Sequence, residues 1–92
     1  MRHDQGDFAV RNDLVRASLV ELFAWDEDEF LRRSEGSAIR RSGYSRWLRN
    51  IAVALGNAPT TADTVAALES RRDIDDAVVR EHVAWALARH GR

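Results

Sequence analysis

The sequence YSRWLRNIAVALGN, residues 44–57, decides the fold of this 92-residue chain. The intervals between six of its apolar side chains alternate between three residues and one: Tyr44, Trp47, Leu48, Ile51, Ala52 and Leu55. This spacing puts all six on one face of an α-helix. A Gly-Asn pair at 56–57, reinforced by Pro59, is typical of a helix end. We therefore predict a helix that begins near Tyr44 and stops at this pair.

The segments on both sides of this helix are also predicted to be helical. A candidate N-cap residue precedes each of the other helices: Asn12 or Asp13, Asp26, Thr60 or Thr61, and Asp75 or Asp76. Asp26 with Glu29 resembles a capping box, and Gly36 is expected to end that short helix. Residues 37–43, SAIRRSG, are predicted to form a loop. No segment alternates with the period of two that would predict a strand.

A short internal repeat indicates how the helices are arranged. The pentapeptides IAVAL, residues 51–55, and VAWAL, residues 83–87, are offset by 32 residues. Repeats near this period are typical of stacked helix pairs. We therefore predict an all-α fold of about five helices, stacked as HEAT-like helix-pair repeats. Residues 11–92 are expected to form this single domain, with 1–10 as a tail or linker.

Composition excludes several classes of function. The chain contains no cysteine, which rules out within it a disulfide scaffold, a thiolate nucleophile and a cysteine-ligated zinc or iron–sulfur site. The N-terminal residues lack the apolar core of a signal peptide, and no apolar run is long enough to span a bilayer. A cytoplasmic protein is expected. His3, His82 and His90 have no metal-ligand spacing, so neither a metal site nor a catalytic constellation is predicted.

The charge is unevenly distributed along the chain. All fourteen basic residues are arginines, and the formal net charge is −1. Residues 1–35 hold five arginines and nine acids, whereas residues 36–62 hold four arginines and no acid. A basic band between more acidic flanks suits a phosphate backbone. The candidate RNA-binding residues are Arg40, Arg41, Arg46, Arg49 and Asn50.

An internal role for these arginines is the alternative. They could pair with the acids of residues 26–29 or with Glu35 instead of with phosphate. Arg49 and Arg80 are the most suited to such a structural role, because an arginine at that point of a helical repeat often bridges to a neighbouring acid. Asp75 and Asp76 are expected to cap a helix rather than to catalyse a reaction.

The aromatic residues are expected to serve mainly in packing. Trp47 lies on the apolar stripe and is predicted to be core, and Trp25 is predicted to pack at the end of the first helix. For Tyr44, burial is preferred to stacking on a base. The last helix has a second face, made of Val78, His82, Trp85 and Arg89. That face is expected either to cover the preceding helix or to contact another domain.

A resemblance to a known family covers nearly the whole chain. Residues 22–59, LFAWDEDEFLRRSEGSAIRRSGYSRWLRNIAVALGNAP, closely resemble the C-terminal domain of bacterial epoxyqueuosine reductase. The likeness continues at AALESRRD, residues 66–73, and REHVAWALA, residues 80–88, and reaches back to GDFAVRNDL, residues 6–14. Members of this family reduce epoxyqueuosine in tRNA to queuosine, at the wobble position of the anticodon.

The resemblance implies a tRNA-binding helical module that holds the anticodon arm. Cobalamin and two iron–sulfur clusters, which full-length members use, would belong to catalytic domains that these 92 residues lack. The chain itself is therefore expected to have no catalytic residue, and its partners are expected to be tRNA and those N-terminal catalytic domains. The alternative is an interaction repeat that packs on the catalytic domain and stabilises it. Exposed apolar residues on the face of Val78 and Trp85 would favour that alternative.

Overall fold

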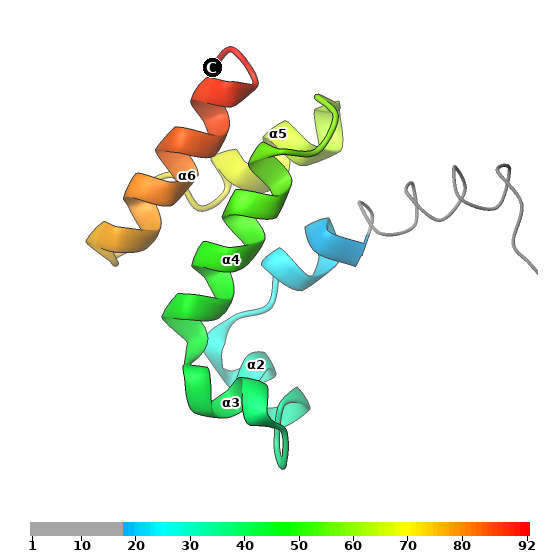
Figure 1. Ribbon diagram of the computed structural model, residues 1–92, viewed down its shortest axis with the longest axis vertical. Helices are drawn as coiled ribbons and strands as arrows, with labels where there is room; N and C mark the ends of the chain where they lie inside the picture. The colour runs from blue at the N-terminus through cyan, green and yellow to red at the C-terminus, as the bar shows by residue number, and fades with distance from the viewer. Residues whose placement is uncertain (1–17) are drawn as a thin grey trace, which may run out of the picture.

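The computed structural model describes residues 18–92, and these are helical without a strand. A helical segment at residues 18–23 precedes five helices, in the order α2 (Glu27–Arg33), α3 (Ala38–Ser42), α4 (Tyr44–Gly56), α5 (Ala62–Glu69) and α6 (Ala77–Arg89) (Figure 1). The predicted all-α fold is confirmed. The predicted tail at residues 1–10 and the N-cap at Asn12 or Asp13 lie outside the described residues.

Side-chain caps begin four of these helices. Asp26 accepts a hydrogen bond from the Glu29 backbone N–H at 2.8 Å, and Thr61 accepts one from the Thr64 N–H at 3.1 Å. Asp76 accepts from the N–H groups of two residues of α6, both at 3.1 Å. The predicted caps at Asp26, Thr61 and Asp76 are thus confirmed. The fourth cap, Ser37, begins a helix that the sequence did not predict.

Helix α3 corrects the predicted loop at residues 37–43. Ser37 accepts a hydrogen bond from the Ile39 N–H at 3.1 Å, so a side-chain cap supports the first turn. Gly43 follows at φ +95°, a value that favours glycine, and α4 begins at the next residue. The five residues of α3 include no buried side chain, which is why they show no apolar stripe that would have identified a helix.

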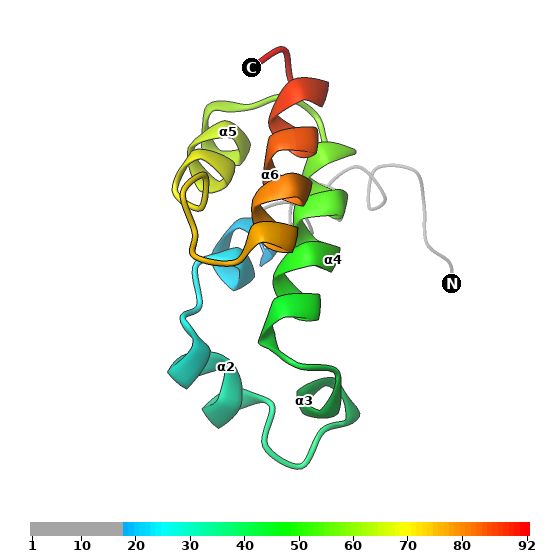
Figure 2. The same cartoon turned by 90° about the vertical axis from the view of Figure 1, so that its left-hand side faces the viewer.

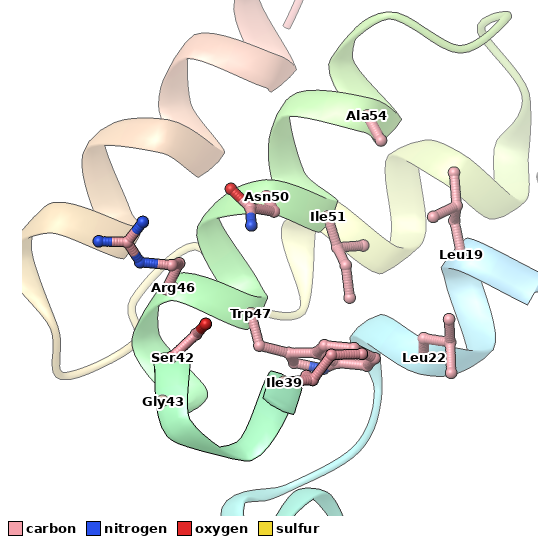
Figure 3. Close-up of a pocket in the computed structure, with 10 residues that line it drawn as sticks. All are labelled: Leu19, Leu22, Ile39, Ser42, Gly43, Arg46, Trp47, Asn50, Ile51 and Ala54. Carbon is pink, nitrogen blue, oxygen red and sulfur yellow. The ribbon is translucent and has the colours of Figure 1, made fainter. Parts of the chain in front are cut away.

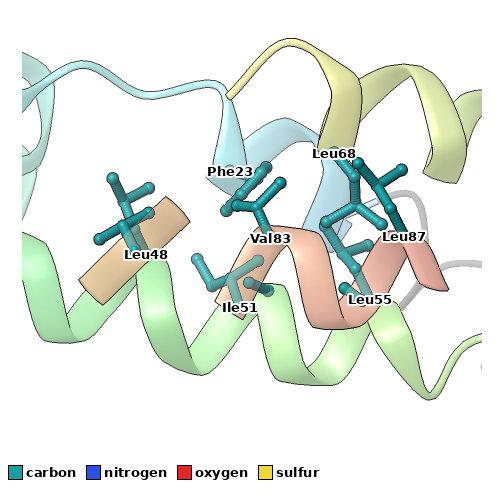
Figure 4. Packing of buried hydrophobic residues seen from close by; sticks show 10 residues of the cluster. Phe23, Leu48, Ile51, Leu55, Leu68, Val83 and Leu87 are labelled. Carbon is teal, nitrogen blue, oxygen red and sulfur yellow. The ribbon is translucent and has the colours of Figure 1, made fainter. Parts of the chain in front are cut away.

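The hydrophobic core lies mainly between α4, α5 and α6. Its buried members are Phe23, Leu48, Ile51, Ala52, Leu55, Leu68, Val79, Val83, Ala86 and Leu87 (Figure 4). The four buried residues of α4 in this set belong to the predicted apolar stripe. Burying each of the larger side chains contributes about 1.5–3 kcal/mol, so this cluster provides most of the packing energy of the small domain.

The two repeated pentapeptides lie on α4 and α6, which run side by side in the same direction (Figures 1 and 2). At their starts, Asp76 before α6 lies near Ser45 of α4. At their ends, Arg89 donates from Nε to the carbonyl oxygen of Gly56 at 3.1 Å, and His90 donates from Nε2 to that of Leu55 at 2.8 Å. The end of α6 thereby satisfies carbonyl groups that the last turn of α4 leaves free. None of the helices in residues 18–92 has the length and apolar character needed to cross a membrane.

Candidate nucleic-acid interface

Three of the candidate RNA-binding arginines lie around the junction of α3 and α4. Arg40 and Arg41 are exposed on α3, and Arg46 is exposed on the first turn of α4. The sharp turn at Gly43 joins the two helices that carry the three residues. Helix α4 begins without a side-chain cap, so the N–H groups of its first turn lack the acceptor that the other helices supply. Such a helix start favours negative charge.

The acids suggested as internal partners are engaged elsewhere. Glu29 forms ion pairs with Arg32 and Arg33 of its own helix, and the pKa of its carboxyl lies below the ordinary value chiefly because of the hydrogen bond from Arg33. The other ion pair within residues 18–92 joins Glu69 and Arg72 at 3.1 Å. Across this part of the chain, no ion pair involves residues 40, 41 or 46. Their charge is therefore not neutralised by a described acid.

Arg49 lies in a different environment from the other three arginines. It is half-buried, and its Nε has no hydrogen-bond partner in the described part of the chain. The positive charge helps to lower the pKa of Asp76, although the hydrogen bond from the Val79 N–H is the largest cause. Arg49 thus faces the start of α6. The next residue, Asn50, is exposed.

An apolar groove of about 350 Å³ adjoins Arg46 (Figure 3). Ten residues line it: Leu19, Leu22, Ile39, Ser42, Gly43, Arg46, Trp47, Asn50, Ile51 and Ala54. In Figure 3, the side chains of Trp47 and Ile51 point toward Leu19 and Leu22, whereas Arg46 points to the other side of α4. The groove therefore has an apolar floor with polar residues along one edge.

The aromatic residues below this groove have structural roles. Trp47 is half-buried and stacks on Trp25, with 5.4 Å between ring centroids, and its ring also packs on Phe30 at 5.3 Å. The Tyr44 hydroxyl donates to the carbonyl oxygen of Trp25 at 2.6 Å, and burial raises the pKa of this hydroxyl. The packing roles predicted for these residues fit this arrangement, and Tyr44 is not presented to a base.

Two arginines outside the predicted set connect distant parts of the backbone. Arg71 donates to the carbonyl oxygens of Phe23 and Trp25, with distances of 2.8–3.1 Å, and Arg89 donates to Gly56. Arg80, for which a bridge to an acid was considered, instead donates to the carbonyl oxygen of Ile74 at 2.8 Å. Residue spacing does not identify such partners, because a backbone carbonyl has no sequence signature.

Comparison with proteins of known name shows what this chain is similar to. A protein of Xanthomonas campestris named Epoxyqueuosine reductase is 70% identical over 90 residues, which make up 98% of this chain and 25% of that protein. A protein of the same name in Pseudomonas aeruginosa is 60% identical, and the match covers 95% of this chain and 24% of that protein. For the Escherichia coli protein of that name the identity is 56%, over 89% of this chain and 21% of the relative.

This chain matches the C-terminal part of epoxyqueuosine reductase. It spans about a quarter of the length of the curated epoxyqueuosine reductases it matches. No family model matches the chain, and no solved structure matches it.

The iron–sulfur clusters that the resemblance implies for full-length epoxyqueuosine reductases do not fit the residues present. The chain has no cysteine to ligate an iron–sulfur cluster. Residues 18–92 also bring together no group of three or more His, Asp and Glu side chains that could hold a metal ion.

Proposed function

We propose that this chain is the tRNA-binding helical module of an epoxyqueuosine reductase. It holds the anticodon arm while other parts of the enzyme reduce epoxyqueuosine to queuosine. The observation that carries the proposal is the exposure of Arg40, Arg41 and Arg46 beside the uncapped start of α4. None of these three arginines forms an ion pair with another described residue. A guanidinium group binds a phosphate oxygen pair through two parallel N–H bonds, which suits it to an RNA backbone.

The contacts are mainly to phosphate rather than to base edges. The three cationic side chains lie on the short helix α3 and on the first turn of α4. No exposed aromatic ring of the groove lies beside them. Arg49 contributes to the interface indirectly, because its half-buried positive charge lies near Asp76 at the start of α6. Asn50 is exposed one turn from Arg46 and adds an amide that can contact the RNA.

Salt dependence tests this function directly. Each phosphate contact adds about 0.7–0.9 to the slope of log K against log salt, so replacing both Arg41 and Arg46 by Gln should flatten the slope by nearly two units. The measurement is a titration of a synthetic tRNA anticodon-arm hairpin with the purified chain at several salt concentrations. Circular dichroism should show unchanged helix content, because both side chains are exposed.

A matched control separates specific contacts from net charge. The double variant Arg32→Gln with Arg72→Gln removes the same charge from two exposed arginines that form ion pairs within their own segments. Its salt slope should stay close to that of the unmodified chain. An equal slope for all three proteins, or an equal loss in both double variants, contradicts the assignment of Arg41 and Arg46 to phosphate.

A second function, packing on the catalytic part of the same enzyme and stabilising it, is favoured by one observation. Val53, Val78 and Trp85 are large apolar residues that are exposed on α4 and α6. If docking were the main function, tRNA affinity of the full-length enzyme would not depend on Arg41 and Arg46. Its melting temperature would instead fall when Trp85 is replaced.

A further inference from the structure

The central positions of the two repeated pentapeptides are exposed, although the first and last positions of each are buried. Val53 of α4 and Trp85 of α6 are 38% and 43% exposed, while Leu55 and Ala86 are fully buried. These two positions are equivalent at the 32-residue offset. Since α4 and α6 run side by side in the same direction, equivalent residues belong to adjoining rows of one surface. An exposed tryptophan at such a position points to an interaction site.

The same surface carries polar side chains in register with these two residues. Along α4, Arg46 and Asn50 precede Val53 at intervals of four and three residues, and along α6 Val78 and His82 precede Trp85 at the same intervals. Such intervals keep residues on one helix face. We call Arg46, Asn50, Val53, His82, Trp85 and Arg89 the two-row face. Its α4 row includes Arg46, so the face is continuous with the proposed phosphate-binding region.

The Trp85 ring is held in place before any partner binds. A side chain at Gly56 would have its Cβ 2.7 Å from Trp85 Cζ3, which shows how closely the ring rests on the end of α4. The Arg89 guanidinium lies over the ring at 5.2 Å from its centroid, and its Nε is fixed to the Gly56 carbonyl. Stacking a partner on this ring therefore costs little side-chain conformational entropy at Trp85.

A hollow of about 340 Å³ lies beside this ring and is lined by Val53, Glu81, His82 and Trp85. His82 Nδ1 lies 2.8 Å from the carbonyl oxygen of Val78, which can only accept, so Nδ1 carries the proton. In the neutral ring Nε2 is then an acceptor, suited to an amino group of a base. The carboxylate of Glu81 disfavours a phosphate in the hollow but accepts hydrogen bonds from base amino or imino groups.

We propose that an unpaired nucleobase of the bound RNA stacks on Trp85 and occupies the hollow between α4 and α6. The inference rests on the proposed function and adds to it a residue that selects single-stranded RNA. Unpaired bases are usually held by stacking on aromatic rings, often with arginine side chains nearby. Arg46 and Val53 are seven residues apart, about 10 Å along the helix axis, so one strand can contact both regions.

The test compares two RNA probes with variants of Trp85. The probes are the anticodon-arm hairpin, which has an unpaired loop, and a fully paired RNA duplex of the same length. Trp85→Ala should weaken hairpin binding roughly fivefold to a hundredfold, the range found for loss of one base stack. Duplex affinity should stay the same, and so should the salt slope, because no charge is removed. Trp85→Phe, which keeps an aromatic ring, should retain most of the hairpin affinity.

The control variant is Val78→Ala, which truncates an exposed apolar residue of the same helix that lies outside the two-row face and does not line the hollow. It should leave hairpin affinity within about twofold of the unmodified chain. Tryptophan fluorescence gives a second readout, because stacking on a base quenches the indole. The quenching should persist in Val78→Ala and be much reduced in Trp85→Phe, which keeps Trp25 and Trp47.

Four outcomes overturn the inference. If Trp85→Ala leaves hairpin affinity unchanged while the arginine variants still flatten the salt slope, the proposed function holds and the stacking role fails. The same conclusion follows if hairpin and duplex binding weaken equally. If sedimentation shows that the unmodified chain self-associates and Trp85→Ala does not, with RNA binding unaltered, the face is a protein interface. A chain that binds neither RNA contradicts the proposed function itself, and the stacking role with it.

Discussion

At the scale of single residues, Gly56 shows how closely α4 and α6 approach. A Cβ at this position would lie 2.7 Å from Trp85 Cζ3, 3.0 Å from Ala86 Cβ and 3.1 Å from Ala86 Cα. The Trp85 ring is held by Arg89, and the Ala86 backbone belongs to a packed helix, so neither can give way freely. Overpacking of this kind typically costs 1–3 kcal/mol.

We accordingly expect Gly56→Ala to lower the free energy of unfolding by about 1–3 kcal/mol, despite the higher helix propensity of alanine. Urea denaturation followed by circular dichroism measures it. Combining this change with Trp85→Ala should recover part of the loss, because the closest contact disappears, and the coupling should exceed ~0.5 kcal/mol. Additive effects of the two changes would mean that the ring does not press on the end of α4.

Arg46 and Arg49 show what the sequence reveals about the site and what it does not. The apolar stripe predicted α4 and placed both arginines off that stripe. Residues three apart differ by about 60° around a helix axis, since each residue turns by about 100°. This difference leaves Arg46 exposed and turns Arg49 toward Asp76. The sequence does not state on which side of the stripe α6 packs, so the two could not be separated in advance.

At the scale of helices, the caps were predictable because each depends on one side chain and the N–H groups two or three residues later. Helix α3 was not, because a five-residue helix without a buried side chain has no periodic pattern. The repeat at 51–55 and 83–87 indicated two equivalent helices, but the contacts of Arg89 and His90 with the end of α4 had no sequence signal. They depend on the relative position of two helix ends that are more than thirty residues apart.

The start of α6 gives the domain a predictable response to acid. Hydrogen bonds hold the pKa of Asp76 below its ordinary value of 3.8, the largest from the Val79 N–H and the next from the Ser45 hydroxyl. A carboxyl whose pKa is lowered by folding stabilises the fold above its unfolded pKa, and this contribution is lost as the pH falls through the folded pKa. The loss from Asp76 should therefore appear below about pH 4.

Asp76→Asn tests this response, because the amide oxygen can still cap α6 but does not titrate in this range. Melting curves at pH 7 and at several values below 4 should show a smaller acid-induced fall in Tm for the variant. The matched change Asp75→Asn, one residue earlier at an exposed position, should leave the slope of Tm against pH nearer to that of the unmodified chain. Identical acid profiles for all three proteins would contradict the role of Asp76.

At the scale of the whole molecule, stability is unevenly distributed. The buried residues concentrate on α4, α5 and α6, whereas α3 buries none of its side chains and yet carries Arg40 and Arg41. Segments with few buried contacts open locally at a low free-energy cost, and binding sites are often drawn from them. The domain thus combines a packed core of α4, α5 and α6 with the basic helix α3, which is held by few buried contacts.

Hydrogen exchange should reveal this distribution. We expect the amides of α3 to exchange much faster than those in the interiors of α4 and α6, which should approach the protection set by global unfolding. Mass spectrometry of peptides covering residues 38–42 and 48–55 measures the difference. The anticodon-arm hairpin should slow exchange in α3, since bound phosphate restrains Arg40 and Arg41. Equal protection of the two peptides in the free chain would show that α3 is held as firmly as the core.

The parallel course of α4 and α6 has a consequence for how such a protein can lengthen. Two neighbouring helices that point the same way are related by a displacement along the stack, and a displacement can be applied again without reversing any surface. Duplication of one 32-residue segment would add another helix of the same orientation and, with it, another side chain at the position of Val53 and Trp85. A gene could thus extend the surface one unit at a time, and each new unit could acquire its own specificity by changing a single residue.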